Sequence, residues 1–464
     1  MTSTTTPRPV TRELADWVVA ARKHPLPPEV GHHSRRVLLD YLAAAFSGSR
    51  SDSAVLVRDY LEASEAPGAI QVLGTGVRLS AAQAALATGT AAHGLEVDDG
   101  YTPGAYHPGA PVISAALAAA EQHGSTLDEL LTAIALGFEV SCRLAGAGHP
   151  TTWRRGLHNT PLAGVFGAAV AVTTLLDADE QQTIDAFGLA GSHAGGLFEF
   201  LGSGAEVKRL HAGKAARDGL VCAELAIRGL SGPATVLEGA KGYGAVFVDG
   251  ELDEAHLADD LGNTWRMLRT YVKPYPCCRH LHGPIDAVLE LVAEHGVRAE
   301  DVRAVEVGTY PVAVGHGFHE VDDFIDAQMS IPYAVAVTLT HGTPGLEHFG
   351  DEMRRDPRVR ALADTVSVHE DPDCTRDYPA MRPARVRLVT ANGELETRID
   401  QPWGEPDRPV DDDALVAKLH RLVDPICGAA AVDEIATEVW NGSGSLAPLL
   451  AVLARAGAAE VVMA

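Results

Sequence analysis

The sequence predicts a mainly α-helical protein, with a large all-helical domain and a smaller α/β domain. Two observations lead to this fold class. Stretches rich in Ala, Gly and Leu, such as residues 109–121 and 212–230, suit helices that pack closely through small contact residues. After about residue 270 the pattern changes, and short segments with the alternating polarity of half-buried strands appear.

Apolar side chains in the first 270 residues recur every three or four positions, which is the period of one face of an α-helix. This pattern predicts helices over residues 11–21, 28–45, 79–93, 112–123, 126–145, 163–176, 184–193, 212–228 and 253–261. No convincing series of strand-like segments occurs before about residue 270. We therefore expect this part of the chain to be a helical body.

Residues 271–404 are expected to form the α/β domain. Strands are predicted at 302–309 and 365–368, and at 385–389 and 394–399 on either side of Asn392-Gly393, a dipeptide that tolerates the positive φ angles of a tight hairpin turn. Helices are predicted at 284–295, 327–339 and 350–356. The Pro-rich segment 401–409 leads to helices at 412–423 and 445–454, so residues 1–270 and 405–464 should together form the helical domain.

The net charge indicates which kind of binding partner is favoured, and the cysteine content indicates the cellular compartment. The 464 residues carry a formal net charge of −25, which disfavours nucleic acid or an anionic membrane as a partner. A small anionic substrate fits better, because the segments described below carry Lys, Arg and His, although an acidic surface also serves solubility alone. Six scattered cysteines, an N-terminus without an apolar signal core and the lack of an uncharged apolar stretch of about 18 residues predict a cytoplasmic protein.

A loop rich in histidine and carboxylate follows the predicted helix 79–93. Its sequence, AHGLEVDDGYTPGAYHP at residues 92–108, contains Gly and Pro that disfavour regular structure, and irregular segments on a rigid scaffold often carry function. The candidate site residues are Glu96, Asp99, Tyr101 and His107. One alternative is a solvated acidic loop. Another is a metal site made by His93, Asp98, Asp99 and His107, although their spacing matches no helical metal-binding motif.

Two cationic segments could hold a carboxylate. In WRRGLHNT, residues 153–160, Arg155 and His158 precede a helix whose free N-terminal N–H groups favour anions. In EVKRLHAGKAARDG, residues 206–219, Lys208 and Arg209 belong to a cluster in which a lysine among other cations can become an acid or base near neutral pH. The alternatives are surface arginines in the first segment and a solvated basic helix face in the second.

Two further segments lie in the expected α/β domain. YVKPYPCCRHLH, residues 271–282, holds an extended, proline-bounded lysine followed by basic and sulfur side chains; its candidates are Lys273, Cys278, Arg279, His280 and His282. The vicinal cysteines lack the C-x-x-C spacing of zinc sites, and a plain interdomain linker is the alternative. IDAQMSIPYAV, residues 325–335, places Tyr333 on a helix, where a buried structural tyrosine is the alternative.

In this order and spacing, the segments resemble the MmgE/PrpD family. LLDYLA at residues 38–43 and GPATVLEG at 232–239 add to the resemblance, which runs from about residue 11 to residue 453. It implies a large helical domain with a smaller α/β lid, a homodimer, and no metal or organic cofactor. It also implies dehydration, decarboxylation or epimerisation of a small polycarboxylic acid.

Transferred motif by motif, the resemblance implies five catalytic residues: His107 of the loop, His158 of GLHNT, Lys208 of VKRLH, Lys273 of KPYP and Tyr333 of SIPY. Two positions depart from the decarboxylase branch of the family. Its loop Asp is Glu96 here, with one residue inserted before His107, and its third His falls on Cys278. The text KPYPCCRH is more similar to epimerase-like and uncharacterised members.

These residue types suit a proton transfer beside a carboxylate. Lys208, Lys273 and Arg279 would stabilise the negative charge that builds up. His107 and His158 would exchange the proton, with Tyr333 as a donor. We expect a cofactor-independent lyase, either a dehydratase or a decarboxylase, acting on a small di- or tricarboxylic acid. An epimerase of an iminodisuccinate-like diacid is the alternative; a metal-dependent hydrolase and an inactive carboxylate-binding protein are less favoured.

Overall fold

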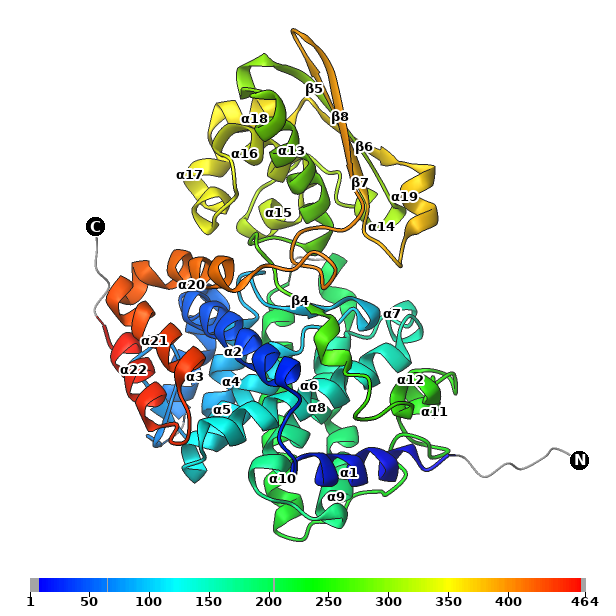
Figure 1. Cartoon of the computed structure of the whole chain (residues 1–464), viewed down its shortest axis with the longest axis vertical. Coiled ribbons are helices and arrows are strands. Elements are labelled where there is room, and N and C mark those ends of the chain that lie inside the picture. Colours follow the sequence, from blue (N-terminus) through cyan, green and yellow to red (C-terminus); the bar gives the residue numbers. More distant parts are fainter. Residues whose placement is uncertain (1–7, 65, 203–204, 460–464) are drawn as a thin grey trace, which may run out of the picture. The chain divides into compact units, whose positions relative to one another are not determined.

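The computed structural model describes residues 8–64, 66–202 and 205–459. The chain forms two compact units, of which the first comprises Met1–Tyr271 with Asp411–Ala464 and the second Val272–Val410. The first unit is almost wholly helical, and the second contains a four-stranded sheet with helices against it (Figure 1). The predicted fold class, mainly α with a smaller α/β region, is confirmed.

The helices of the first unit follow one another through short connections. They are α1 (Val10–Ala21), α2 (Pro28–Gly48), α3 (Asp52–Ser64), α4 (Ala81–Ala92), α5 (Gly109–His123), α6 (Leu127–Gly148), α7 (Thr151–Arg154), α8 (Asn159–Leu175), α9 (Glu180–His193), α10 (Val207–Ile227), α11 (Tyr243–Phe247), α12 (Glu254–Ala258), α20 (Asp412–Cys427), α21 (Ala429–Asn441) and α22 (Ala447–Gly457). Helices α3 and α21 were not predicted. Helix α3 buries few side chains and has a weak helical signal. Helix α21 buries Val432, Ile435, Ala436 and Val439 at the helical spacing, but polar and Gly-rich sequence surrounds it.

The core of the first unit lies around α8, which packs against α5, α6, α9 and α10. Residues on every side of α8 are apolar and buried, as expected for a helix enclosed by others. Helix α6 begins with a capping box formed by Thr126 and Glu129. It is long and apolar enough to cross a membrane, but 89% of its most apolar window is buried inside the protein, which is typical of a core helix.

Glycines bring α4 and α10 into close contact. A Cβ atom at Gly213 on α10 would lie 2.2 Å from the carbonyl oxygen of Leu86, and one at Gly89 on α4 would lie 2.8 Å from Gly213 Cα. Neither position therefore accepts a side chain unless the helices separate. Because of this contact, the loop that follows α4 lies beside the first turn of α10, which carries Lys208 and Arg209.

Short strand pairs also occur in the first unit. Strand β1 (Ile70–Gln71) pairs with β2 (Arg78–Leu79), and β3 (Gly100–Tyr101) pairs with β4 (Thr270–Tyr271), both antiparallel. Each has only two residues, which is too short to give an alternating pattern in the sequence. The β3–β4 pair nevertheless fixes the middle of the loop after α4.

The sheet of the second unit has the order β6-β5-β7-β8, built from β5 (Val302–Thr309), β6 (Val366–Glu370), β7 (Ala384–Thr390) and β8 (Gly393–Ile399). Strands β5 and β6 are parallel and the other pairs antiparallel. The predicted hairpin is present: Thr390 pairs with Gly393, whose φ of 133° suits glycine. Val305, Val307, Val386 and Leu388 of the two central strands are fully buried.

Helices lie on both sides of this sheet. In Figure 1, α13 (His282–His295), α16 (Ile331–His341) and α18 (Pro357–Ala363) are on one side, and α14 (Pro311–Val314) and α19 (Pro372–Asp377) are on the other. Helices α15 (Phe324–Met329) and α17 (Asp351–Arg354) complete the unit. The helix predicted at 350–356 is therefore only one turn, because Asp356 caps α18 instead of continuing α17.

Candidate active site

The loop between α4 and α5 carries a buried cluster of histidine and carboxylate side chains. His93 ends α4, and its Nδ1 lies 2.6 Å from Asp98 Oδ2. The same oxygen lies 3.6 Å from His107 Nδ1, which also hydrogen-bonds to the main-chain oxygen of Asp99 at 2.6 Å. The Asp99 carboxylate accepts a hydrogen bond from Gly109 N at the start of α5. The loop thus holds two histidines around one carboxylate.

Contacts from distant parts of the first unit fix this loop. Asn159 Nδ2 at the start of α8 donates a hydrogen bond of 2.5 Å to Gly104 O. Lys418 Nζ on α20 donates one of 2.7 Å to Val97 O. Together with the β3–β4 pair, these bonds replace the regular structure that Gly and Pro disfavour, so an irregular loop keeps a defined conformation.

Two further histidines adjoin the cluster. His158, the N-cap residue of α8, is 2% exposed, and its ring stacks at 6.0 Å from that of His93. His158 Nδ1 lies 2.9 Å from His211 Nδ1 on α10, so one ring donates a hydrogen bond to the other. Phe198 packs against the His158 ring with 4.9 Å between ring centres. Four histidines from α4, the loop, α8 and α10 therefore form one continuous group.

Glu96 joins the loop to the basic first turn of α10. Its Oε1 forms an ion pair with Lys208 and lies 2.9 Å from Arg209 Nη1. All three side chains are largely buried. Glu96 adopts a φ of 56°, in the left-handed region that residues other than glycine rarely occupy, and such strain gathers at functional sites.

Burial controls the charge of the histidines. It lowers the pKa of His93 against the opposing effect of Asp98, and it lowers the pKa of His158 well below the usual range, helped by the neighbouring His93 and His211. Burial likewise lowers the pKa of His211 to about 4. These three rings are neutral near pH 7, the state in which an imidazole can accept a proton.

His93 is arranged as a base. A carboxylate can only accept, so the bond between His93 and Asp98 places the ring proton on Nδ1 and leaves a lone pair on Nε2. Nε2 is buried and has no hydrogen-bond partner within the described parts of the chain. From the sequence, His93 and Asp98 are candidates only as metal ligands. The sequence signal, a histidine five residues before an aspartate, was too general to reveal the pair.

The other predicted residues of the first unit lie outside this group. Tyr101 is buried in β3, with its hydroxyl 3.5 Å from His256 Nε2. Arg155 is exposed and forms an ion pair with Asp249. The exposed position of Arg155 agrees with the alternative that this arginine is a surface charge. Arg155 directly follows the short helix α7, whereas His158 is buried as the N-cap residue of α8.

The predicted residues of the KPYPCCRHLH segment lie in the second unit. Lys273 is 1% exposed. Arg279 pairs with Glu405 at 3.0 Å and donates hydrogen bonds to Trp403 O and to His282 Nδ1. Arg279 thereby joins the segment to the turn around residue 404.

Sulfur and imidazole groups of the same segment meet a third histidine. Cys278 Sγ lies 3.9 Å from Nε2 of His316, and His280 Nδ1 lies 2.7 Å from the Tyr310 hydroxyl. His316 was not predicted from the sequence, because it follows α14 in a connection without a recognisable motif.

Tyr333 occupies the core of the second unit. It lies in the first turn of α16 and donates its hydroxyl proton to His348 O at 2.6 Å. Burial raises its pKa above the usual range for tyrosine. This arrangement corresponds to the alternative of a structural tyrosine, because the hydroxyl is engaged by the main chain.

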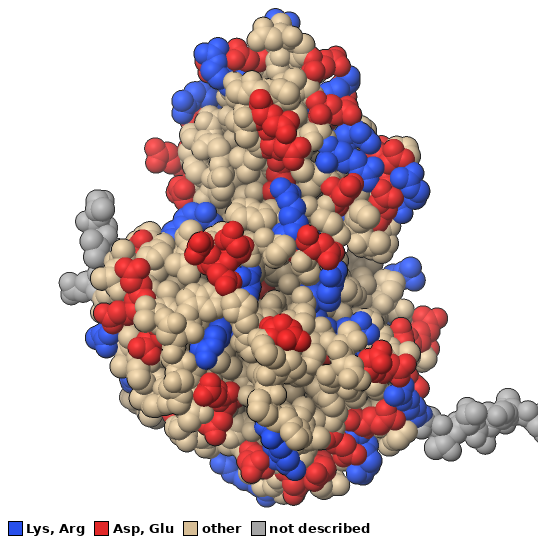
Figure 2. All heavy atoms as spheres, in the orientation of Figure 1, with Lys and Arg blue, Asp and Glu red and all other residues tan. Residues whose placement is uncertain are grey.

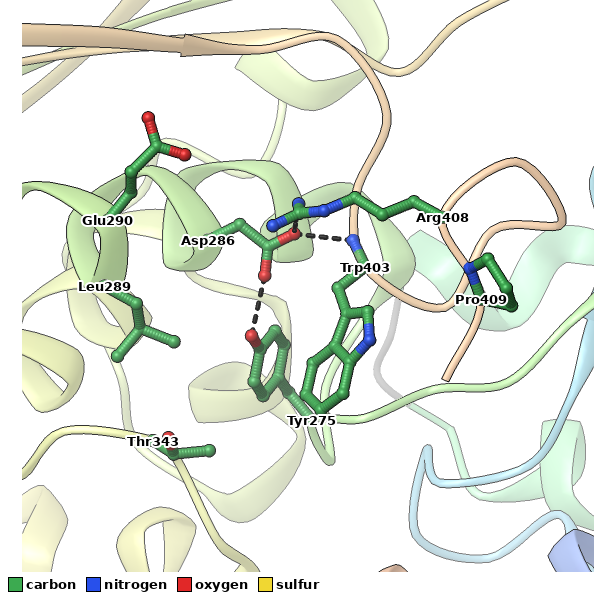
Figure 3. Close-up of a pocket in the computed structure, with 8 residues that line it drawn as sticks. All are labelled: Tyr275, Asp286, Leu289, Glu290, Thr343, Trp403, Arg408 and Pro409. Atoms are coloured by element: carbon green, nitrogen blue, oxygen red, sulfur yellow. Dashed lines mark hydrogen bonds and ion pairs between the residues drawn. The ribbon is translucent and has the colours of Figure 1, made fainter. Parts of the chain in front are cut away.

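A pocket of about 610 Å³ opens in the second unit (Figure 3). Asp286 at its edge accepts hydrogen bonds from the Tyr275 hydroxyl, Trp403 N and Arg408 Nη1, at 2.6, 2.6 and 2.8 Å. With Asp286 so engaged and Glu290 also lining the pocket, the site is poorly suited to an anion. We interpret Asp286 as an anchor for the segment that carries Lys273.

Charge on the surface is mixed. On the face drawn in Figure 2, acidic side chains form patches with basic ones between them. The cations suited to a carboxylate are instead buried, at Lys208 and Arg209. In the loop, Asp99 Oδ1 accepts a hydrogen bond from Gly109 N and His107 Nδ1 bonds to the main-chain oxygen of Asp99, so these two atoms are not available to a metal ion.

Comparison with known proteins agrees with these observations. The MmgE/PrpD N-terminal domain model matches residues 12–255, and the MmgE/PrpD C-terminal domain model matches residues 275–442. Cis-aconitate decarboxylase of Aspergillus terreus is 28% identical over 92% of this chain and 91% of its own length. The human cis-aconitate decarboxylase is 27% identical over 93% and 91%. 2-Methylcitrate dehydratase of Cupriavidus necator is 29% identical over 32% of this chain and 33% of its own. With both family domains matched in order along the sequence, the chain belongs to the MmgE/PrpD family.

Proposed function

We propose that this MmgE/PrpD-type lyase removes carbon dioxide or water from a small di- or tricarboxylic acid by moving a proton at the carbon next to a carboxylate, with no metal or organic cofactor. The observation that carries the proposal is the Nε2 of His93, which is buried and has no hydrogen-bond partner among the residues that the structure describes. The ring is oriented by Asp98 and lies beside His158. Relatives named as a decarboxylase and a dehydratase support this reaction type.

Lys208 and Arg209 would bind a substrate carboxylate. In the structure both cations are directed at Glu96 Oε1, so the site already holds a carboxylate between a lysine and an arginine. A substrate carboxylate would share these donors, and in a buried site their charge would stabilise the developing carbanion or enolate. Glu96 then serves to neutralise the two cations when no substrate is bound.

The histidine group would move the proton. His93, with Asp98 behind it, has the arrangement of a general base. In the His158–His211 pair, a proton taken up by one ring at its Nε2 can be relayed across the Nδ1···Nδ1 bond to the other ring. His107 is 17% exposed, so it can meet both solvent and substrate. A positioned acid or base of this kind contributes roughly 10²–10⁴ in rate.

Epimerisation of a diacid is the second candidate. It requires one group to take a proton and another to return it on the opposite face. The pairs His93–His107 and His158–His211 supply two such groups, with ring centres 5.2 Å apart in each pair. From the family resemblance and the cysteine pattern we also propose a cytoplasmic homodimer.

The test is proton NMR in D₂O with EDTA present, using cis-aconitate, 2-methylcitrate and an iminodisuccinate-type diacid as separate substrates. Loss of carbon dioxide or of water would identify a decarboxylase or a dehydratase, and deuterium uptake without either loss would identify an epimerase.

Variants test the histidines with the same assay. His93→Gln and His158→Asn should each lower the rate at least 100-fold. Arg155→Gln, on the surface, is the matched control and should retain full activity. No turnover of any of these acids, or turnover only after a divalent metal is added, would contradict the proposal.

A further inference from the structure

Three metal-binding side chains converge in the second unit. Cys278 precedes the short 3₁₀ turn Arg279–Leu281, His280 lies within that turn, and His316 follows α14. Each of the three side chains offers one ligand atom, the sulfur of Cys278 or a ring nitrogen of a histidine. These three atoms lie within 4.8 Å of one another. We propose that Cys278, His280 and His316 form a binding site for a transition-metal ion of the Zn²⁺ class.

The distances are close to those that zinc requires. With Zn–S near 2.3 Å, Zn–N near 2.0–2.1 Å and tetrahedral angles, a bound sulfur and nitrogen lie roughly 3.6 Å apart. Cys278 Sγ and His316 Nε2 are already 3.9 Å apart. His280 is the third ligand. Side-chain movements of up to about 1 Å, in the turn that carries His280 and in the connection that carries His316, would bring it to the same spacing.

Hydrogen bonds orient both imidazoles. His316 Nδ1 donates to Met329 O at 2.9 Å, so the lone pair is on Nε2, the nitrogen that faces Cys278. His280 Nδ1 bonds to the Tyr310 hydroxyl, whose ring stacks on Tyr378 with 4.2 Å between ring centres. Metal-binding histidines in proteins are usually held in this way by a partner on the other ring nitrogen.

A bound ion would have charged neighbours on this segment. The positive charge of the adjacent Arg279 is balanced by Glu405. Zinc would displace the thiol proton of Cys278, so one proton leaves for each ion bound, and three protein ligands leave the fourth position to water. All three side chains are partly exposed, which gives the ion a route in.

Binding at this site would affect the proposed reaction. Cys278 and His280 are also candidate substrate contacts, so an ion held by them should act as a reversible inhibitor. Binding itself, however, does not depend on the identity of the substrate. The two ideas can therefore fail separately.

The experiment uses full-length protein stripped with EDTA and then dialysed. Cobalt chloride is titrated while the absorption of a thiolate–Co²⁺ complex is followed, and zinc chloride is titrated by calorimetry in two buffers to count released protons. The variants are Cys278→Ser, His316→Ala and Tyr310→Phe. Cys427→Ser, which removes a similarly exposed cysteine of the first unit, is the matched control. Circular dichroism verifies that each variant is folded.

We expect one ion per chain, with the thiolate–Co²⁺ band and one released proton, in the wild type and in Cys427→Ser. The band should vanish in Cys278→Ser. His316→Ala should weaken zinc binding at least ten-fold, and Tyr310→Phe, which removes only the hydroxyl beside His280, about ten-fold. Absence of the band in folded wild type, or equal zinc affinity in Cys278→Ser and Cys427→Ser, would overturn the proposal whether or not the enzyme turns over a carboxylic acid.

Discussion

Lys418 on α20 forms a buried ion pair with Asp40 on α2, with 2.5 Å between Nζ and Oδ1. The same ammonium group donates to Val97 O in the loop that carries Glu96, Asp98 and His107. A lysine near the C-terminus thus holds the candidate active-site loop against a helix near the N-terminus. The main effect of this pair is structural support of that loop.

Removing this lysine should destabilise the protein. Lys418→Met leaves Asp40 buried without its partner, and the free energy of unfolding should fall by about 3–5 kcal/mol. Burial already raises the pKa of Asp40, so its carboxyl group can take up a proton in the variant, and the loss should be smaller at pH 5 than at pH 8. Urea unfolding at both pH values measures this. Lys418→Met combined with Asp40→Leu should recover part of the loss, and a double variant as unstable as the single one would contradict the assignment.

The neutral histidines predict how stability depends on pH. His211 has a folded pKa of about 4 against 6.5 for an unperturbed histidine. Between these values the unfolded chain binds the proton that the folded chain refuses, so this histidine destabilises the fold increasingly as pH falls from 6.5 towards 4. Its contribution should change by at most about 1.4 kcal/mol per pH unit.

The difference in unfolding free energy between wild type and His211→Asn isolates this effect, since asparagine does not titrate. Relative to wild type, the variant should gain stability as pH is lowered through this range and show a constant difference above pH 7. A difference independent of pH from 7 to 4 would show that His211 titrates normally.

Charge removal at Glu96 tests its role. Glu96→Gln keeps the shape but leaves Lys208 and Arg209 without a carboxylate, so a dicarboxylate inhibitor should bind about five-fold tighter, or about 1 kcal/mol. Calorimetric titration with succinate measures this, and Arg155→Gln should leave the affinity unchanged. If Glu96→Gln weakens binding instead, then Glu96 contacts the ligand itself and does not merely balance the two cations.

Tyr333 should contribute to stability more than to turnover. Tyr333→Phe removes one hydrogen bond to His348 O and should lower the free energy of unfolding by about 1 kcal/mol. The value of kcat/KM should stay within about three-fold of wild type. A catalytic proton donor would instead give a loss of roughly 10²–10⁴, so a steady-state assay decides between the two roles.

The sequence predicts this fold well where one local pattern is strong. The apolar periodicity of α4, α5, α6 and α8 and the Asn392-Gly393 turn each give a signal within a short window. Helix α21 is missed although its buried apolar residues follow the helical period, because polar and Gly-rich sequence surrounds it. The two-residue strands β3 and β4 are missed because their pairing joins residues far apart in the sequence, as in Gly100 with Tyr271, 171 positions away.

The candidate site is only partly visible in the sequence. Its segments could be identified as chemically rich. Glu96 pairs with Lys208, His107 and His158 belong to the histidine group, and the charge of Lys208 acts on His158. Whether an arginine lies on the surface, and which ring nitrogen of a histidine forms a hydrogen bond, depends on packing between residues far apart in the sequence. A short stretch of sequence does not contain that information. Arg155 and His93 are therefore the two residues whose surroundings the sequence describes least well.

The glycine contact between α4 and α10 has a consequence for how this enzyme could change its substrate over evolutionary time. A side chain at Gly213 or Gly89 would meet the opposite backbone, so this close helix packing sets the gap between the loop and the first turn of α10. New specificity must then arise by exchanging side chains on an unchanged frame. A directed-evolution library confined to residues 94–107 and 207–211 would sample most of that change while leaving the helical body intact.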